Sequence, residues 1–461
     1  MTAPMAEPRT SYMPRPSSFL PGRLRVLRET LESSLWPVPL AMIGLAVAAW
    51  WVATWLDSAL APDTMLQQRW LHSGSGDDAR NLLSTLVTAI ITISSIVFSI
   101  TIVTLTLAAN QFGSRLIRIY MSDLWSKLSL GLFVMTVIYC LLALRVIEKE
   151  MAPHQVPHVT VLVGLVLAVG CVIVLVVFLH NVARSIVADE VIRRVAGELE
   201  EAIASLEDGA TGTDSPSVAA EGCNDVRCPP AMLRSIKEGY VQAVRYEALV
   251  DAAQRDDVLI ELTFRPGTFM CREGWLARVQ PGSRFGEELN CAVQKAVLIG
   301  RLRTPTQDLE YSMRHLIDVA LRALSPGIND ANTAMVVIDR LRGALSALMG
   351  KRLRPAVYRD AAGEPRVFAP THSYSDLLEY AFAQIRHSAA SQPAVVLQVL
   401  EAIERIAEHA SLSEQFASLK AQARLAAEEG TARAVSENDR QTIAERLRTT
   451  LQRVDAAAAL A

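Results

Sequence analysis

Seven small polar side chains recur along one apolar stretch of the chain, and their spacing is the first feature that suggests chemistry. They follow one another at three-, four- and seven-residue steps, as Ser84, Thr88, Thr92, Ser95, Ser99, Thr106 and Asn110. This spacing places them along one face of a helix. Hydroxyl oxygens can replace part of an ion's hydration shell, so such a face could line a water-filled pathway. Two basic residues, Arg115 and Arg118, follow and would stand at one mouth of that pathway.

A second interpretation of this polar face stays open. Small hydroxyl side chains also let transmembrane helices approach closely and hydrogen-bond across their interface. The pathway interpretation requires several copies of the chain, because the four helices of one copy leave little room for a pore. The stretch contains no Asp, Glu or Lys, which argues against a proton relay or an ion-coupled pump. Passive conduction is therefore the form of the pathway hypothesis that the sequence favours.

A turn followed by a helix start is predicted from the segment SPGIND, residues 325–330. Asn329 or Asp330 can cap the helix that follows. Helix-start amides can also bind an anion, and three arginines are close in sequence, namely Arg301, Arg303 and Arg322. Capping with domain packing and binding of a ligand therefore both remain open for this segment.

Signatures of catalysis and of metal binding are absent from the sequence. It contains no GxSxG, HExxH, GxxxxGKS or GxGxxG motif, and its eight histidines are scattered. Its six cysteines include no CxxC pair, so we expect neither a metal site nor a disulfide framework. The net charge of -3 gives no reason to expect a nucleic-acid partner. The sequence does not suggest an enzyme.

Four long apolar stretches must position the polar face. Each is long enough, at about 1.5 Å per residue, to cross a hydrocarbon core of roughly 30 Å. Backbone polar groups in lipid must bond internally, so each stretch should be helical. The four stretches cover residues 36–56, 82–109, 128–147 and 156–179.

Lysine and arginine in the connecting segments predict the orientation of these spans. The N-terminal segment, the loop after the second span and the segment after the fourth are basic, whereas the other two loops are not. Basic segments stay in the cytoplasm, so both termini should be cytoplasmic. The expected partners are therefore the lipid bilayer and, for the pathway hypothesis, further copies of the chain and a small ion.

The fold class predicted is an α-helical membrane domain followed by a cytoplasmic α+β domain. We divide the chain into an N-terminal segment (1–35), a four-helix transmembrane domain (36–187), a helix and flexible linker (188–230), a small β module (231–282) and a mainly helical domain (283–461). Strands are expected at 240–244, 258–264 and 275–279. Helices are expected at 285–300, 307–324, 332–348, 374–387, 394–410 and 437–454. The last of these is amphipathic, and both pairing with a second copy and exposure as a terminal helix remain open.

The β module resembles half of a lipoyl- or biotinyl-type barrel in its order of strands and its Pro-Gly turn. No lysine occurs between Gly239 and Gly282 to carry such a group. We therefore expect no attached cofactor.

Two segments together resemble one known family. They are RLRTPTQDLEYSMRHLIDVALRALSPGINDANTAMVVIDRL, from Arg301, and SITIVTLTLAANQFGSRLIRIYMSD in and after the second span. They resemble the bacterial predicted-membrane-protein family catalogued as domain of unknown function 2254, where RT-x-x-QD, DIA-x-RALSPGINDP-x-TA and DRL recur beside a second span ending QF-S-R. Ala331 stands where that family usually has proline.

The resemblance runs through all four spans to about Leu341 and implies a bacterial inner-membrane protein with no established reaction. Within it, the candidates for a ligand site or a structural turn are Arg303, Gln307, Asp308, Ser325, Asn329 and Asp330. Two functions are left in competition by the sequence. One is an oligomeric ion channel or passive transport protein with a cytoplasmic regulatory domain, and the other is a membrane-tethered sensor or scaffold that conducts nothing.

Overall fold

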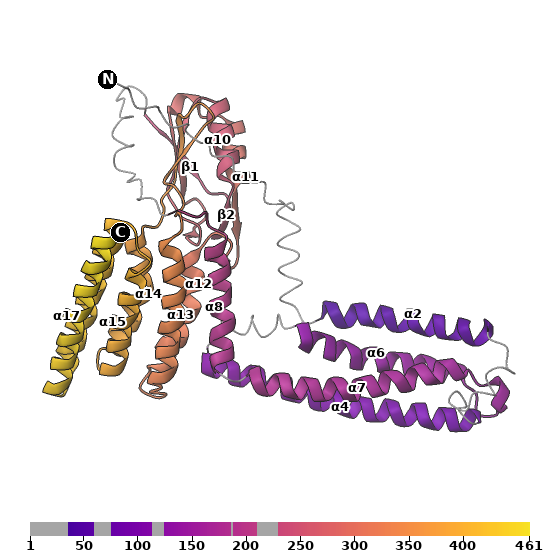
Figure 1. Cartoon of the computed structure of the whole chain (residues 1–461). Coiled ribbons are helices and arrows are strands. Elements are labelled where there is room, and N and C mark those ends of the chain that lie inside the picture. The colour runs from indigo at the N-terminus through magenta and orange to yellow at the C-terminus, as the bar shows by residue number, and fades with distance from the viewer. Residues whose placement is uncertain (1–35, 60–74, 113–123, 186–187, 210–228) are drawn as a thin grey trace, which may run out of the picture. The chain divides into compact units, whose positions relative to one another are not determined.

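The computed structural model describes residues 36–59, 75–112, 124–185, 188–209 and 229–461 (Figure 1). Arg115, Arg118 and residues 210–228 of the predicted linker lie outside these residues, so the predictions made for them are not described. The chain forms two compact units, of which one ends at Glu190 and the other begins at Val191. Each unit is described below by itself.

The first unit contains four helices that are long and apolar enough to cross a membrane. They are α2 (Pro37–Ala59), α4 (Gly76–Phe112), α6 (Leu124–Val146) and α7 (His158–Ser185). The four predicted spans are thereby confirmed as helices. Helix α4 has 37 residues, or about 56 Å, and is therefore much longer than a hydrocarbon core of roughly 30 Å.

Helices α6 and α7 pack against each other, and both also contact α2 and α4. The interior holds large, fully buried side chains such as Leu83 of α4 and Tyr139 and Phe133 of α6. Gly164 of α7 leaves room for this packing, because an added Cβ atom would lie 3.1 Å from a methyl group of Leu83. Helix α6 is the most enclosed of the four, because half of its apolar, membrane-spanning segment is buried.

Two charged side chains join helix ends within this unit. Asp57, near the end of α2, accepts a hydrogen bond from the backbone N–H of Thr160 at 3.0 Å and another from its hydroxyl at 2.7 Å. Arg80 of α4 donates to the carbonyl oxygens of Leu144 and Ile147 at the end of α6. The first turn and the last turn of a helix each leave backbone groups without partners. Asp57 and Arg80 satisfy some of these groups on neighbouring helices.

The second unit contains two β-sheets. The larger has the order β1-β5-β3-β8-β7 and is antiparallel except for the pair β3 and β8. Its strands are β1 (Ala231–Arg234), β3 (Leu259–Leu262), β5 (Trp275–Gln280), β7 (Val357–Arg359) and β8 (Pro365–Phe368). The smaller sheet is antiparallel, with the order β4-β2-β6, and consists of β4 (Phe269–Met270), β2 (Gly239–Val244) and β6 (Val297–Gly300).

Two short helices, α10 (Tyr246–Arg255) and α11 (Glu287–Ala296), complete the core of the sheets. The strands expected at 240–244, 258–264 and 275–279 are confirmed as β2, β3 and β5. The sheets extend beyond residues 231–282, because β6, β7 and β8 come from later in the chain. The helix expected at 285–300 is wrong over its last four residues. They form β6, where Val297 pairs with Val244 of β2, and this pairing overrides the helical pattern.

Six further helices in the described part of this unit pack side by side (Figure 1). They are α12 (Leu309–Ala323), α13 (Ala331–Met349), α14 (Tyr374–Ala389), α15 (Pro393–Ala407), α16 (Ser413–Arg433) and α17 (Glu437–Leu460), preceded by α8 (Ala188–Ala204). Five of the expected helices are confirmed, and α16 was not predicted. Helix α17 packs against α15 and α16 of its own chain. There Glu404, which is only 2% exposed, pairs with Arg446 and Arg453 of α17.

Replacing Asp57 with Ala should destabilise the first unit by about 0.5–2 kcal/mol, because the start of α7 loses its capping carboxylate. Thermal unfolding in detergent, followed by circular dichroism, would measure the change. Thr54→Ala is the control, since among the described residues the Thr54 hydroxyl bonds to carbonyls of its own helix alone. Equal losses in the two variants would show that the contact between α2 and α7 is not stabilising.

Candidate functional site

The polar face predicted on the second span lies on the outside of the first unit. Ser84, Thr88, Thr92, Ser95, Ser99 and Thr106 are all exposed. The opposite face of α4 is buried against α6 and α7 through Leu83, Val87, Ile90 and Val97. The side chain of Asn110 lies outside the described residues. Among the described residues of the first unit, none packs over this face.

The hydroxyl groups on this face differ in their hydrogen bonds. Thr88, Thr92 and Thr106 each donate to the carbonyl oxygen four residues earlier, at 2.9–3.0 Å. The three serines of the face, Ser84, Ser95 and Ser99, make no hydrogen bond through their hydroxyls to any described residue. These three serine hydroxyls therefore keep hydrogen-bonding capacity that the described residues do not use.

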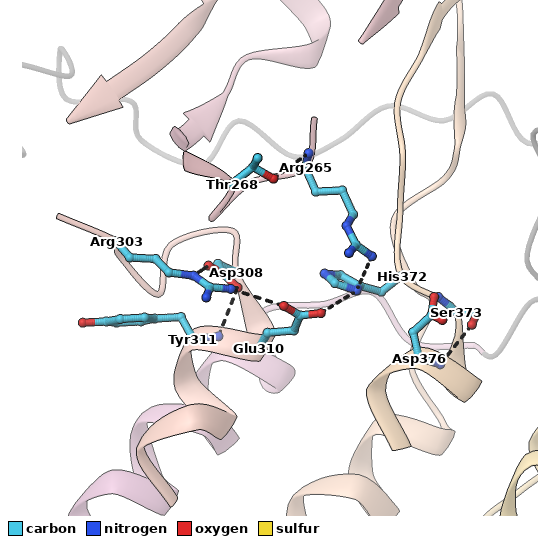
Figure 2. A network of polar contacts seen from close by, with 9 residues as sticks. All are labelled: Arg265, Thr268, Arg303, Asp308, Glu310, Tyr311, His372, Ser373 and Asp376. Atoms are coloured by element: carbon cyan, nitrogen blue, oxygen red, sulfur yellow. Dashed lines mark hydrogen bonds and ion pairs between the residues drawn. The ribbon is translucent and has the colours of Figure 1, made fainter. Parts of the chain in front are cut away.

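In the second unit, the predicted residues Arg303 and Asp308 come together at the start of α12 (Figure 2). The guanidinium of Arg303 donates from Nε and from Nη2 to the Asp308 carboxylate, the latter at 3.0 Å, and Nη2 also donates to Glu310 at 3.3 Å. Asp308 is 2% exposed, and it also accepts from the Tyr311 N–H as the N-cap of α12. A buried carboxylate of this kind is stable because it is paired and hydrogen-bonded.

The Pro266-Gly267 turn lies directly against this ion pair. Gly267 has a φ of +88°, and a Cβ atom built there would stand 2.0 Å from Oδ2 of Asp308 and 2.8 Å from Nε of Arg303. Glycine is needed at position 267 for two reasons. It permits the left-handed backbone conformation, and it leaves room for the Asp308 carboxylate. The turn of the β-sheet region is thereby locked to the start of the helical region.

Gln307 makes a second link between the same two regions. Its side-chain amide accepts from the N–H of Val244 at 2.8 Å and donates to the Val244 carbonyl at 3.1 Å. These two bonds reproduce the pairing of a neighbouring β-strand at the end of β2. Gln242 of β2 also donates to the carbonyl of Leu302 at 2.8 Å. The segment containing Arg303, Gln307 and Asp308 therefore acts as structural packing between sheet and helices.

His372 was not singled out in the sequence, yet it lies in the same network (Figure 2). Its Nδ1 atom is 3.0 Å from Nη1 of Arg265 and 3.3 Å from a carboxylate oxygen of Glu310. Burial, followed by the charge of Arg265, lowers the pKa of His372 to about 4. The imidazole is therefore neutral near pH 7, and Nδ1 accepts the hydrogen bond from Arg265.

The family motif that begins with Arg303 and Asp308 continues beyond α12. Its second half, the SPGIND segment (residues 325–330), lies at the other end of that helix. Asp330 caps α13 by accepting from the Thr333 N–H at 3.0 Å and from its hydroxyl, which confirms the predicted cap. These hydrogen bonds lower the pKa of Asp330. Asn329, with a φ of +52°, accepts from Gln392 at 2.9 Å, and the Ser325 hydroxyl donates to the carbonyl of residue 322.

Helix α12 separates these two halves. Its 15 residues span about 22 Å, so Arg303 cannot reach the start of α13. An anion site that combines Arg303 with the SPGIND segment is therefore not formed within one copy. In the described residues, no group of three or more His, Cys, Asp or Glu side chains could hold a metal ion.

A groove of about 590 Å³ opens beside the network, over α14 and between the start of α12 and α16. Arg265, Glu310 and Asp376 form one end of it (Figure 2). Sequence reasoning missed Arg265, Glu310 and His372 because they lie far apart in the chain. The RPG turn and the Ser373-to-Asp376 capping box were the local signals that marked their elements.

Four apolar helices followed by a unit of mixed helices and sheets define a membrane protein with four candidate spans. The chain belongs to the family described as predicted membrane protein, domain of unknown function 2254 (DUF2254), which it matches over residues 32–405. Uncharacterized proteins of Mycobacterium bovis and Mycobacterium tuberculosis are each 27% identical to it over 401 residues, which is 84% of this chain and 74% of theirs. No solved structure matches the chain.

Replacing Gly267 with Ala should destabilise the second unit by more than about 1 kcal/mol, since the new methyl group would enter the Arg303-Asp308 contact at a strained φ. Chemical unfolding of the purified protein would measure the loss. Gly327→Ala is the matched control, because that glycine has open space around it. Similar stabilities for the two variants would contradict the locking role of the turn.

The stability of the second unit should fall as the pH is lowered from about 6.5 to about 4. In this window the unfolded chain binds a proton at residue 372 that the folded chain does not, because the folded pKa is about 4 and the reference value is 6.5. His372→Gln, which can still accept from Arg265, should reduce this slope. Thermal unfolding at several pH values would show it, and an unchanged slope in the variant would assign the effect to other groups.

Proposed function

We propose that the protein is an oligomeric membrane protein in which the α4 helices of several copies face one another around a passive pathway for small ions. The observation that carries the proposal is the exposed hydroxyl face of α4, because a polar face in lipid must meet protein or water. From Ser84 to Thr106 this face covers 23 residues, and the distance along the helix axis between the two ends is about 33 Å, which is close to the thickness of a hydrocarbon core.

The spacing of the face also suits packing between copies. Thr88, Thr92, Ser95, Ser99, Ile102 and Thr106 alternate at steps of four and three residues, and all six are exposed. This is the repeat of a left-handed coiled-coil seam, which stays in register over its whole length. Five of the six side chains carry hydroxyls, so the seam could pair closely in a small assembly or surround water in a larger one. The oligomeric state decides between these arrangements.

The remaining parts of the proposal rest on the sequence. The basic loops favour an inner-membrane orientation with both termini and the second unit in the cytoplasm. Arg115 and Arg118 would then stand at the inner mouth, where they would attract anions. No enzymatic activity is proposed, because the chain has no recognised catalytic motif.

A membrane-tethered sensor or scaffold is the second candidate. It is favoured by the groove over α14, which is close to the size of a small-molecule site. Chemical cross-linking of the purified protein would separate the two candidates first, because a monomer leaves only the sensor.

Replacing Ser95 or Ser99 with Leu should abolish current in a reconstituted bilayer while the oligomer still assembles, because a bulky apolar group would narrow the pathway and remove hydroxyl oxygens. Single-channel recording and cross-linking would measure the two properties separately. Phe98→Leu is the control, since this exposed residue of α4 lies off the seam. A different pair of results would assign the face to packing between helices. In that case the Leu variants would lose the oligomer, and the wild type would pass no current under voltage, tension or a salt gradient.

A further inference from the structure

Three loops of the second unit lie together at one end of its helical region, and we call them the loop end. They cover residues 324–330, 390–392 and 434–436. The Gln392 side chain donates to Asn329 at 2.9 Å, which joins the first two loops. A Cβ atom built on Gly430, near the end of α16, would lie 2.9 Å from a methyl group of Val396 in the first turn of α15. The third loop, which follows α16, therefore lies beside the second.

Helix α8 starts at the loop end as well. The chain just after α8 lies at the opposite end of the helical region, because the Lys351 ammonium, directly after α13, donates to the Leu206 carbonyl at 3.3 Å. Helix α13 runs from Asp330 at the loop end to Gly350, its C-cap. Helices α8 and α13 are about 25 Å and about 28 Å long, and Figure 1 shows α8 running along the helical region rather than along the sheets. The first turn of α8 is therefore at the loop end.

This end of the unit is tied to the membrane by a very short stretch of chain. Helix α7, the fourth candidate span, ends at Ser185, and α8 begins at Ala188. Three residues of chain reach at most about 11 Å. A bilayer crossed by α7 is therefore within reach of the loop end in every copy of the protein, whatever the angle between the two helices.

The chemistry of the loop end suits a lipid surface. Val435 is 96% exposed and Ile328 is 50% exposed, and each stands within one of the loops. Asp330 is the one charged residue in the sequence of the three loops, and its carboxylate is used to cap α13. Contact with lipid would therefore take no unpaired charge of these loops out of water. Exposed apolar groups beside a bilayer are stabilised by entering the boundary between headgroups and acyl chains.

We propose that the loop end docks on the surface of the lipid bilayer, with Ile328 and Val435 entering the headgroup region. Lipid is the occupant favoured over a second protein, because the link from α7 holds a bilayer near this end in every copy. The second half of the family motif, SPGIND, then supplies a membrane contact as well as the cap of α13. The contact is independent of the proposed ion pathway, since it stands whether or not the α4 helices conduct.

The test uses the full chain in phosphatidylcholine vesicles, with and without doxyl-labelled lipid as a quencher. The six native cysteines are replaced by alanine, and one new cysteine carries an NBD fluorophore. At Ile328→Cys and at Val435→Cys, doxyl lipid should quench the label at least twofold. Ser411→Cys is the matched control, because this exposed residue lies at the other end of the helical region, where Gln415 donates to the Met349 carbonyl at 3.0 Å. Its label should not be quenched.

A charge variant gives a second measurement. In the protein labelled at residue 435, Ile328→Glu should at least halve the quenching, because a carboxylate resists transfer to the headgroup boundary. Ser411→Glu, which adds the same charge at the other end, should leave the quenching unchanged. Thermal unfolding would verify that each variant is folded.

Three results would overturn the proposal. The first is quenching at residue 328 or 435 that is no greater than at residue 411. The second is equal quenching in the two glutamate variants. The third is a label at residue 328 or 435 that is shielded from water but not quenched, which would show that protein covers the loop end instead of lipid.

Discussion

The second unit depends on the ion pair between Arg303 and Asp308. Removing a carboxylate such as Asp308 from water is costly, and here the cost is met by a guanidinium, by the Tyr311 amide and by the start of α12. The pair can form only because Gly267 allows the chain to pass against it. Sheet and helices thus meet where two segments far apart in the sequence come into contact, namely the Pro266-Gly267 turn and residues 303–311.

This arrangement gives the polar residues of the family motif, Arg303, Gln307, Asp308 and Asp330, a structural role in the second unit. Gln307 pairs with the backbone of β2, and Asp330 caps α13 about 22 Å away along α12. The two halves of the motif therefore lie at opposite ends of α12, and each is held there by its own hydrogen bonds. Side chains that could meet a ligand lie beside the first end, where Arg265 and Glu310 line the groove over α14.

The first unit follows a different constraint, which is that polar groups in lipid need partners. Asp57 and Arg80 satisfy free backbone groups at helix ends inside one copy. Among the described residues, the hydroxyl face of α4 has no partner on another helix, since the face that packs on α6 and α7 is the apolar one through Leu83 and Val97. The described part of the unit therefore leaves the hydroxyl face of α4 exposed.

The sequence alone determined the four helical spans, the polar stripe on the second and a helix cap at Asn329 or Asp330, because apolar length, helical spacing and capping chemistry are local properties of the chain. Tertiary structure decided which way the stripe faces, since neighbouring helices choose the side of α4 that they bury. It also turned residues 297–300 into β6 through pairing with β2. The groove and the neutral His372 could not be foreseen, because their residues come from α12, α14, α16 and two loops that meet only after the chain has folded.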